Sequence, residues 1–198
     1  MKTKKIAILC ILESHSDDNQ IECLNNKFNP LYKFMHTYDK DNTHSKGIVI
    51  VKNNNLIPND LIDITNLVPG RAINVAAIWL KESQINILAT YTPNPPRENE
   101  KFWNHLTKHF TQNNTIQPDI MLGDFNIVEE AIDWLPSHPD PLYAANALHK
   151  LKSTLEQVDS WCCTNTPPDH NFTFDQPSGG SQSRIDRIYM TETYSTAL

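Results

Sequence analysis

The chain has 198 residues, of which 39% are hydrophobic, 20% charged and 9% aromatic, so it is long enough for one sizeable core. Aromatic residues recur inside apolar runs along its whole length, which excludes a disordered chain. The longest uninterrupted apolar run, Ile6–Leu12, is far shorter than the roughly 20 residues of a transmembrane helix, so no membrane-spanning helix is expected.

The formal net charge is −6, which argues against binding nucleic acid by bulk electrostatics. An acidic metal site acting on phosphate remains compatible with this charge, because the metal supplies the positive charge. No small-x-small cleavage site follows Ile6–Leu12, and the four cysteines show no Cys-x-x-Cys spacing. We therefore expect reduced thiols in an intracellular protein, in nucleus or cytoplasm, that is neither secreted nor membrane-bound.

In chain order, the first half of the sequence predicts four strands and one helix. Ile6–Leu12 is short, continuous and rich in branched residues, which is typical of a strand buried on both faces. Ile21, Leu24 and Phe28 have helical spacing after the potential caps Ser16 and Asp17. A strand at 47–51 follows, and then the alternating runs 73–79 and 85–91 predict a hairpin.

The second half predicts two helices and short strands. Apolar residues at helical spacing indicate a helix over 98–112, after the prolines that stop the preceding strand. A short strand at 119–122 leads into Gly123–Asn126. Apolar residues at helical spacing from Leu142 to Val158 then predict a second helix, with Pro141 near its first turn. Two closing strands are expected at 172–174 and 185–190. With no internal repeat or linker, this order favours one domain over residues 1–198, of mixed α and β class.

Carboxylates at the ends of apolar strands are the informative chemical feature, because an acidic group at a core boundary needs a metal or hydrogen bonds to stabilise it. Glu13 follows the first strand, Asp124 follows the strand at 119–122, and Asp186 lies between two apolar residues of the last strand. Each of them taken alone also fits a solvated strand end or a salt bridge.

Taken together, four ordered segments resemble the endonuclease/exonuclease/phosphatase superfamily. These segments are Leu12–His15, Tyr91–Asn94, Gly123–Asn126 and Ser183–Tyr189. Pro69–Ala72, Phe102–Trp103 and Asp124–Asp133 make the sequence most similar to endonuclease domains of fungal non-LTR retrotransposons. The resemblance covers nearly the entire chain, and it implies the DNase I-like fold: an α+β sandwich of two packed mixed β-sheets flanked by helices.

The resemblance also implies roles for individual residues. Glu13 corresponds to a glutamate that binds Mg²⁺, or Mn²⁺ in its place, and a hard oxygen ligand suits either ion. Asp124 corresponds to the aspartate that orients or deprotonates the attacking water, and Asn126 hydrogen-bonds a phosphate oxygen or that aspartate. Tyr91 and Asn94 correspond to a hydroxyl donor and an amide on the phosphate side.

Asp186 corresponds to the aspartate that orients a catalytic histidine in a downstream Ser-Asp-His motif. The 198 residues contain no Ser-Asp-His, and Met1–Lys5 does not match the asparagine-bearing first strand of the family. His170 is the nearest histidine in sequence to the closing strands. We therefore expect a domain that is incomplete at both ends, with a fold that persists and chemistry that is impaired or absent.

Three functions stay open at this point. The resemblance favours a Mg²⁺-dependent hydrolase that nicks DNA, with no obligate protein partner. The alternatives are an inactive remnant that at most binds nucleic acid, and a phosphatase acting on inositol phosphates or other phosphoesters, since a fold does not choose among substrates. Arg184 and Arg187 are candidates for binding substrate phosphate, although scattered basic residues on an acidic chain are more often solvated.

Overall fold

A computed structural model describes residues 1, 5–41, 46–57, 62–79, 83–112, 115–160, 172–177 and 179–195. The chain divides into two compact units, Met1–Tyr91 and Thr92–Leu198, and each is described by itself. The assignment of residues 1–198 to one domain stays a prediction. His170, Trp161, Cys162 and Cys163 lie outside the described residues, whereas Cys10 and Cys23 are free thiols.

The first unit begins with a three-stranded antiparallel sheet of order β1-β3-β2. Its strands are β1 (Ile8–Leu12), β2 (Tyr32–Thr37) and β3 (Ile48–Asn53). The prediction that the first strand is buried on both faces is wrong, because β1 is an edge strand in which Leu9 and Ile11 are exposed. The central strand β3 is the one that is buried at every residue.

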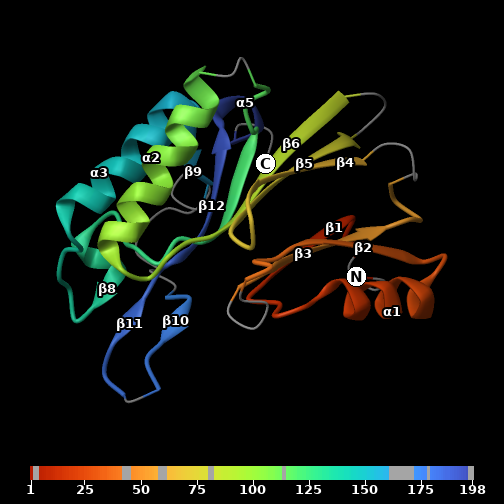
Figure 1. Ribbon diagram of the computed structural model, residues 1–198. Coiled ribbons are helices and arrows are strands. Elements are labelled where there is room, and N and C mark those ends of the chain that lie inside the picture. The colour runs from red at the N-terminus through yellow and green to blue at the C-terminus, as the bar shows by residue number, and fades with distance from the viewer. Residues whose placement is uncertain are drawn as a thin grey trace. The chain divides into compact units, whose positions relative to one another are not determined.

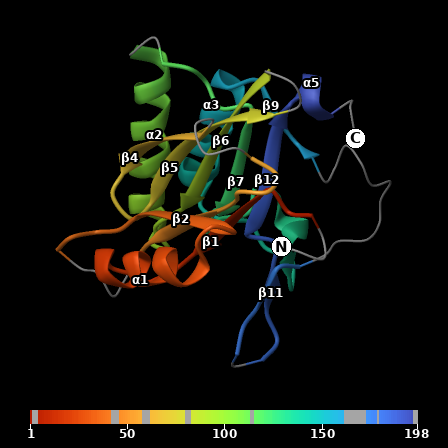
Figure 2. The ribbon, with the colours of Figure 1, turned by 90° about the vertical axis from the view of Figure 1, so that its right-hand side faces the viewer.

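Helix α1 (Asp18–Phe28) lies along one face of this sheet (Figure 2). Ile21 packs with Val49 and Val51 of β3, and Leu24 and Phe34 border this cluster. Asp17 caps the helix, as predicted, because its carboxylate accepts a hydrogen bond from the Gln20 amide while the Gln20 side chain accepts one from the Asp17 amide. The cap and the apolar spacing together explain where this helix begins and which face it buries.

The rest of the first unit is an antiparallel meander of order β4-β5-β6. The strands are β4 (Ile62–Val68), β5 (Ala72–Trp79) and β6 (Ser83–Tyr91). The pairing of β5 with β6, from Ala72 opposite Thr90 to Trp79 opposite Ser83, confirms the predicted hairpin. Because β6 also contacts β1 and β3, two groups of strands pack against each other within this unit, as the predicted two-sheet fold requires.

In the second unit, the antiparallel strands β7, β12 and β9 are neighbours in that order. Their bounds are β7 (Ile120–Asp124), β12 (Asp186–Thr191) and β9 (Gln157–Asp159). The predicted helix that reached Val158 ends earlier, because a turn at Leu155 and Glu156 returns the chain as β9 beside β12. Val158, which is half-buried opposite Met190, therefore belongs to a strand and not to a helix.

Helices α2 (Pro96–Gln112) and α3 (Leu142–Thr154) pack against each other in the second unit (Figure 1). Trp103 of α2 stacks on Phe125 at a centroid distance of 5.2 Å, and Phe125 meets the edge of the Tyr189 ring at 5.1 Å. All three side chains are completely buried. This aromatic stack joins α2 to the residue that directly follows Asp124, so the end of β7 rests on the core.

Shorter elements complete the second unit. They are the 3-10 helix η2 (Ala131–Asp133), β8 (Trp134–Leu135), β10 (Phe174–Asp175), β11 (Gln182–Ser183) and α5 (Glu192–Ser195). Strands β10, β11 and β8 form a small antiparallel sheet, and the β10–β11 hairpin projects away from α2 and α3 in both ribbon views (Figures 1 and 2). Within the described part of the chain, no helix combines the length and apolarity needed to cross a membrane.

Candidate active site

Asp124 and Asp186 lie opposite each other on two neighbouring strands. Asp124 ends β7, Asp186 begins β12, and the antiparallel register pairs the two residues directly. Side chains of directly opposed residues point to the same face of a sheet, with Cβ atoms about 4.5–5.5 Å apart. Two like charges at this distance destabilise a sheet unless something between or beside them compensates, so the register by itself marks this position as chemically unusual.

Asn126 holds the Asp124 carboxylate in one orientation. Its backbone amide donates to Asp124 Oδ1 at 2.9 Å, and its side-chain Nδ2 donates to Asp124 Oδ2 at 3.0 Å. The same Nδ2 lies 3.0 Å from the carbonyl oxygen of Thr92. Asn126 reaches these partners from a left-handed backbone conformation with φ of 47°, which asparagine tolerates better than most residues. The structure therefore brings together three of the predicted site residues, namely Asp124, Asn126 and, opposite Asp124, Asp186.

The segment that carries Asn94 is tied to the same place. The Thr92 amide donates to the carbonyl oxygen of Asp124 at 3.0 Å, and Thr92 in turn accepts the bond from Asn126. Asn94 lies two residues further on, exposed in the turn before α2. Two hydrogen-bonded segments of the second unit therefore carry predicted site residues: one carries Asn94, and the other carries Asp124 and Asn126. The paired strand β12 carries Asp186.

Glu13 and Tyr91 belong to the first unit. Glu13 is exposed just past the end of β1, with a left-handed φ of 51°. Tyr91 is the last residue of β6 and is half-buried, and Arg71 lies beside it with its guanidinium carbon 5.3 Å from the ring centroid. The roles of Glu13 in metal binding and of Tyr91 in phosphate binding stay predictions.

Arg184 and Arg187 are buried among carboxylates. The two carboxylate oxygens of Asp133 accept one hydrogen bond from Arg184 Nε at 2.8 Å and another from Arg187 Nη2 at 2.6 Å. Asp159 lies 3.0 Å from Arg184 and 3.3 Å from Arg187. Only 10% of the Arg184 side chain and 1% of the Arg187 side chain are exposed. Their role in substrate binding stays a prediction, while the structure shows both as members of a buried ion-pair network.

Glu129 extends this network toward α3. Lys152 donates to both of its carboxylate oxygens, at 2.8 and 2.6 Å, and the Tyr189 hydroxyl donates to Oε1 at 2.6 Å. Burial opposes ionisation of Glu129, but the Lys152 charge and these hydrogen bonds hold its pKa below the usual value. Burial likewise opposes ionisation of Asp133, and the Arg187 and Arg184 guanidiniums hold the pKa of that carboxyl low.

No motif in the sequence marks Glu129, Asp133 and Asp159 as partners of the arginines. A signal for them lies in the alternation of β12, in which Asp186 and Ile188 are exposed whereas Arg187 and Tyr189 are buried. Alternation puts Arg187 on the face opposite Asp186, and a buried guanidinium requires carboxylate partners. The partners themselves come from distant positions, which no local pattern identifies.

The donor chemistry around Asp124 suits a hard divalent cation. Mg²⁺ takes oxygen ligands, commonly one or two carboxylates, and keeps several waters. The opposed carboxylates of Asp124 and Asp186 fit that preference, and so does the exposed Glu13 carboxylate considered alone. Among the residues that the structure describes, no group of three or more His, Cys, Asp or Glu side chains is arranged to hold a metal ion.

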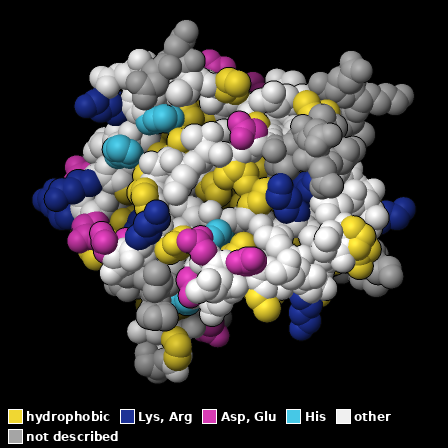
Figure 3. All heavy atoms as spheres, turned by 45° about the vertical axis from the view of Figure 1, so that its right-hand side comes forward, with side chains coloured by type: hydrophobic (Ala, Val, Ile, Leu, Met, Phe, Trp, Pro, Cys, Tyr) yellow, Lys and Arg dark blue, Asp and Glu magenta, His cyan; other side chains and the backbone are white. Residues whose placement is uncertain are grey.

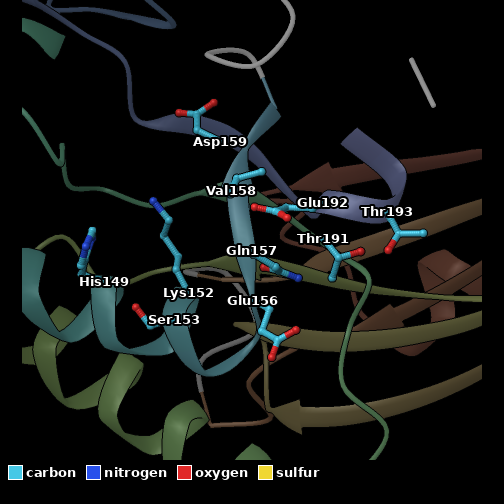
Figure 4. Close-up of a pocket in the computed structure, with 10 residues that line it drawn as sticks. All are labelled: His149, Lys152, Ser153, Glu156, Gln157, Val158, Asp159, Thr191, Glu192 and Thr193. Atoms are coloured by element: carbon cyan, nitrogen blue, oxygen red, sulfur yellow. The ribbon is translucent and has the colours of Figure 1, made fainter. Parts of the chain in front are cut away.

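A separate pocket lies at the far end of β12 from Asp186. Its volume is about 660 Å³, and its lining includes Lys152, Glu156, Asp159 and Glu192 (Figure 4). Thr191, the last residue of β12, also lines it, whereas Asp186 is the first residue of that strand. On the face seen in Figure 3, Lys and Arg side chains of the described residues stand among acidic ones.

Sequence comparison finds similarity to a transposon protein among curated proteins. No protein-family model matches the chain. Over 152 residues the chain is 29% identical to the transposon TX1 uncharacterized 149 kDa protein of Xenopus laevis, a match that covers 74% of this chain. The chain spans only 11% of that relative's length.

Solved structures resemble the chain over nearly its full length. The AP endonuclease LMAP from Leishmania major aligns with a TM-score of 0.79 at 12% identity, covering 99% of this chain and 73% of that one. The endonuclease domain of TRAS1, a telomere-specific non-LTR retrotransposon, aligns with a TM-score of 0.63 at 18% identity, covering 97% and 76%. The D. rerio TDP2 structure complexed with a single-strand DNA product aligns at 0.60 and 13%, covering 97% and 74%.

These likenesses confirm the predicted fold class and the predicted resemblance. Helices flank mixed sheets in the described elements, and the fold aligns over nearly the whole chain with AP endonuclease and retrotransposon endonuclease structures. The chain therefore has the DNase I-like fold of the endonuclease/exonuclease/phosphatase proteins and resembles the endonuclease domains of non-LTR retrotransposons.

Proposed function

We propose that the chain is a phosphodiester hydrolase that nicks DNA with the help of Mg²⁺. The observation that carries the proposal is the pairing of Asp124 with Asp186 in register, with Asn126 bound to both oxygens of the Asp124 carboxylate. A carboxylate held in one orientation is suited to orienting a water molecule and accepting its proton. The resemblance to nuclease structures supports phosphodiesters as the substrate class.

Each residue has a defined task in the proposed reaction. Asp124 positions the attacking water and takes its proton, and Asn126 keeps that carboxylate from rotating. Asn94 and Tyr91 donate hydrogen bonds to phosphate oxygens, and Asp186 increases the negative field at Asp124. Glu13 would hold Mg²⁺, and the bound ion would supply polarisation of the phosphate and neutralisation of developing charge.

The experiment is a nicking assay on supercoiled plasmid with Mg²⁺, with Mn²⁺ and with a chelator. We expect Mg²⁺-dependent nicking that falls at least about 100-fold in Asp124→Asn, because removing a general base commonly costs 10²- to 10⁴-fold. Asp63→Asn, which alters an exposed carboxylate on β4, is the matched control and is expected to retain wild-type activity. Glu13→Gln is expected to raise the Mg²⁺ concentration needed for half-maximal rate.

A substrate panel separates the proposal from its alternatives. Plain plasmid, DNA with an abasic site and a phosphoinositide are compared under the same conditions. If only the phosphoinositide is hydrolysed, the chain is a phosphatase and the proposal that it nicks DNA is wrong. If wild-type protein with a cooperative thermal unfolding transition hydrolyses none of the three, the chain is an inactive remnant and the proposal fails.

A further inference from the structure

Asn99 is a completely buried amide in the first turn of α2. Phe102, Trp103 and Leu106, which follow it on the helix, are buried and apolar. A polar side chain in such surroundings destabilises the fold unless hydrogen bonds compensate for the water it loses. Apolar packing therefore does not explain the presence of an amide at this position.

The Asn99 side chain reaches two segments of the candidate site. Its Nδ2 lies 3.1 Å from Thr92 Oγ1, 3.1 Å from the carbonyl oxygen of Pro93 and 2.9 Å from the carbonyl oxygen of Phe125. Thr92 and Pro93 directly precede Asn94, and Phe125 lies between Asp124 and Asn126. One amide nitrogen therefore holds the loop before α2 and the loop after β7.

Two further hydrogen bonds join the same loops, from the Thr92 amide to Asp124 and from Asn126 Nδ2 to Thr92. Both of these bonds run between the loops. Asn99 adds an attachment to α2, which packs against α3 and whose Trp103 also stacks on Phe125. The helix and its aromatic contact thus provide a rigid reference against which both loops are held.

We propose that Asn99 is a positioning residue for the active site. It fixes the backbone on either side of Asn94 and Asp124, and it does so through Pro93 and Phe125 without touching the reacting atoms. This inference rests on the proposed function, because the geometry that it maintains is that of the water-activating aspartate. A displacement of about 1 Å in such a group is enough to reduce a rate about 100-fold.

Two substitutions of Asn99 keep the branched outline of its side chain while removing its amide donors. Asn99→Leu has no donor, whereas Asn99→Asp has the same shape and donates one hydrogen bond only when its carboxyl is protonated. Because that carboxyl faces three oxygen acceptors, low pH favours the donating form. We expect kcat to fall about 10- to 100-fold in N99L and less in N99D, with KM within about threefold of wild type in both.

The pH dependence gives a readout that a purely structural role would not move. The kcat of N99D relative to wild type is expected to rise as the pH is lowered from 8 to 6, whereas that of N99L stays low. Asn104→Leu, at an exposed position of the same helix, is the matched control and is expected to retain wild-type kcat and KM. Wild-type kcat in both N99L and N99D would overturn the inference.

Amide hydrogen exchange tests the inference without using activity. The Thr92 amide donates to the Asp124 carbonyl and the Asn126 amide to the Asp124 carboxylate, so both report on the two loops. We expect their exchange to be at least about tenfold faster in N99L than in wild type, with amides in the middle of α2 unchanged. If N99L does not fold, N99D at pH 8 takes its place in this measurement.

The two readouts separate the inference from the proposed function. Faster exchange of the Thr92 and Asn126 amides in a chain without any nicking activity supports the positioning by Asn99 and rejects the proposed function. Unchanged exchange of these amides rejects the positioning, whatever the wild-type activity is.

Discussion

Arg71 constrains Tyr91 through three contacts. Its Nη1 donates to the Tyr91 carbonyl oxygen at 3.1 Å, its own carbonyl oxygen accepts from the Tyr91 amide at 2.9 Å, and its guanidinium faces the ring. A cation over an aromatic face is attracted by the ring quadrupole, which here fixes the direction of the tyrosine side chain. Arg71 belongs to Pro69–Ala72, one of the segments on which the family resemblance rests. Through these contacts the segment orients Tyr91.

Replacing Arg71 tests this arrangement. We expect Arg71→Ala to lower kcat for plasmid nicking about threefold to thirtyfold, because a cation–π contact contributes about 0.5–2 kcal/mol. Arg71→Lys keeps a cation but not the planar donor, and it should lie between the alanine variant and wild type. The measurement is steady-state nicking, with the exposed Arg97→Ala as control. A wild-type kcat in Arg71→Ala would contradict the role.

Among the elements, α1 shows most clearly how local sequence defines a boundary. The reciprocal hydrogen bonds between Asp17 and Gln20 satisfy amide groups at the helix start that have no partner within the helix. Ile21 and Leu24 then turn toward Val49 and Val51 of β3. The cap selects the first residue of the helix, and the apolar stripe selects the face that packs on the sheet.

Removal of this cap is expected to destabilise the fold moderately. Asp17→Ala should lower the free energy of unfolding by about 0.5–2 kcal/mol, the usual cost of replacing an aspartate N-cap with alanine. Urea unfolding followed by circular dichroism measures the change. Asn19→Ala, at an exposed position in the first turn, is the comparison and should change stability by less than about 0.5 kcal/mol. Equal effects of the two substitutions would show that the cap contributes nothing specific.

At the scale of the whole molecule, the buried ion-pair network links parts of the second unit that are far apart in sequence. Asp133 follows β7, Arg187 lies in β12, Asp159 ends β9 and Lys152 belongs to α3. A buried charge is costly without its partner, so loss of a single member leaves the others uncompensated. The network therefore makes the packing of these elements depend on one another.

This dependence predicts a loss of stability in acid. Interactions that lower the pKa of Asp133 and Glu129 stabilise the folded state fully above the pKa values of the unfolded chain, about 3.9 and 4.3. The stabilisation is lost as the pH falls through the lower folded-state values. We expect wild-type thermal stability to decrease steeply below about pH 4, and to do so less steeply in Asp133→Asn, which starts from a lower stability.

Thermal unfolding between pH 7 and pH 2 measures this slope. Asp175→Asn, at an exposed position of the β10–β11 hairpin, serves as the control and should follow the wild-type curve. If the thermal stability of Asp133→Asn falls with pH as steeply as that of wild type, Asp133 does not contribute to the acid sensitivity.

The local pattern of the sequence was sufficient for most elements and drew attention to carboxylates at strand ends. Alternation predicted the β5–β6 hairpin, helical spacing predicted α1, α2 and the start of α3, and strand-end carboxylates singled out Asp124 and Asp186. These features depend on neighbours a few residues away, which is why the sequence alone reveals them. Motif order added the DNase I-like fold, which the solved structures confirm.

Tertiary structure alone decided which of these residues meet. The register of β7 against β12 pairs Asp124 with Asp186, and partners from η2, β9 and the loop after β7 take up Arg184 and Arg187. Position within a sheet made β3 and not β1 the strand that is buried throughout, and a turn after α3 made Val158 part of a strand. The contacts of Asn99 were also decided by tertiary structure, since its amide nitrogen hydrogen-bonds to oxygen atoms on two segments that are distant from each other in sequence. Such contacts form when the chain reverses and pairs across long sequence separations. A pattern among neighbouring residues therefore does not predict them.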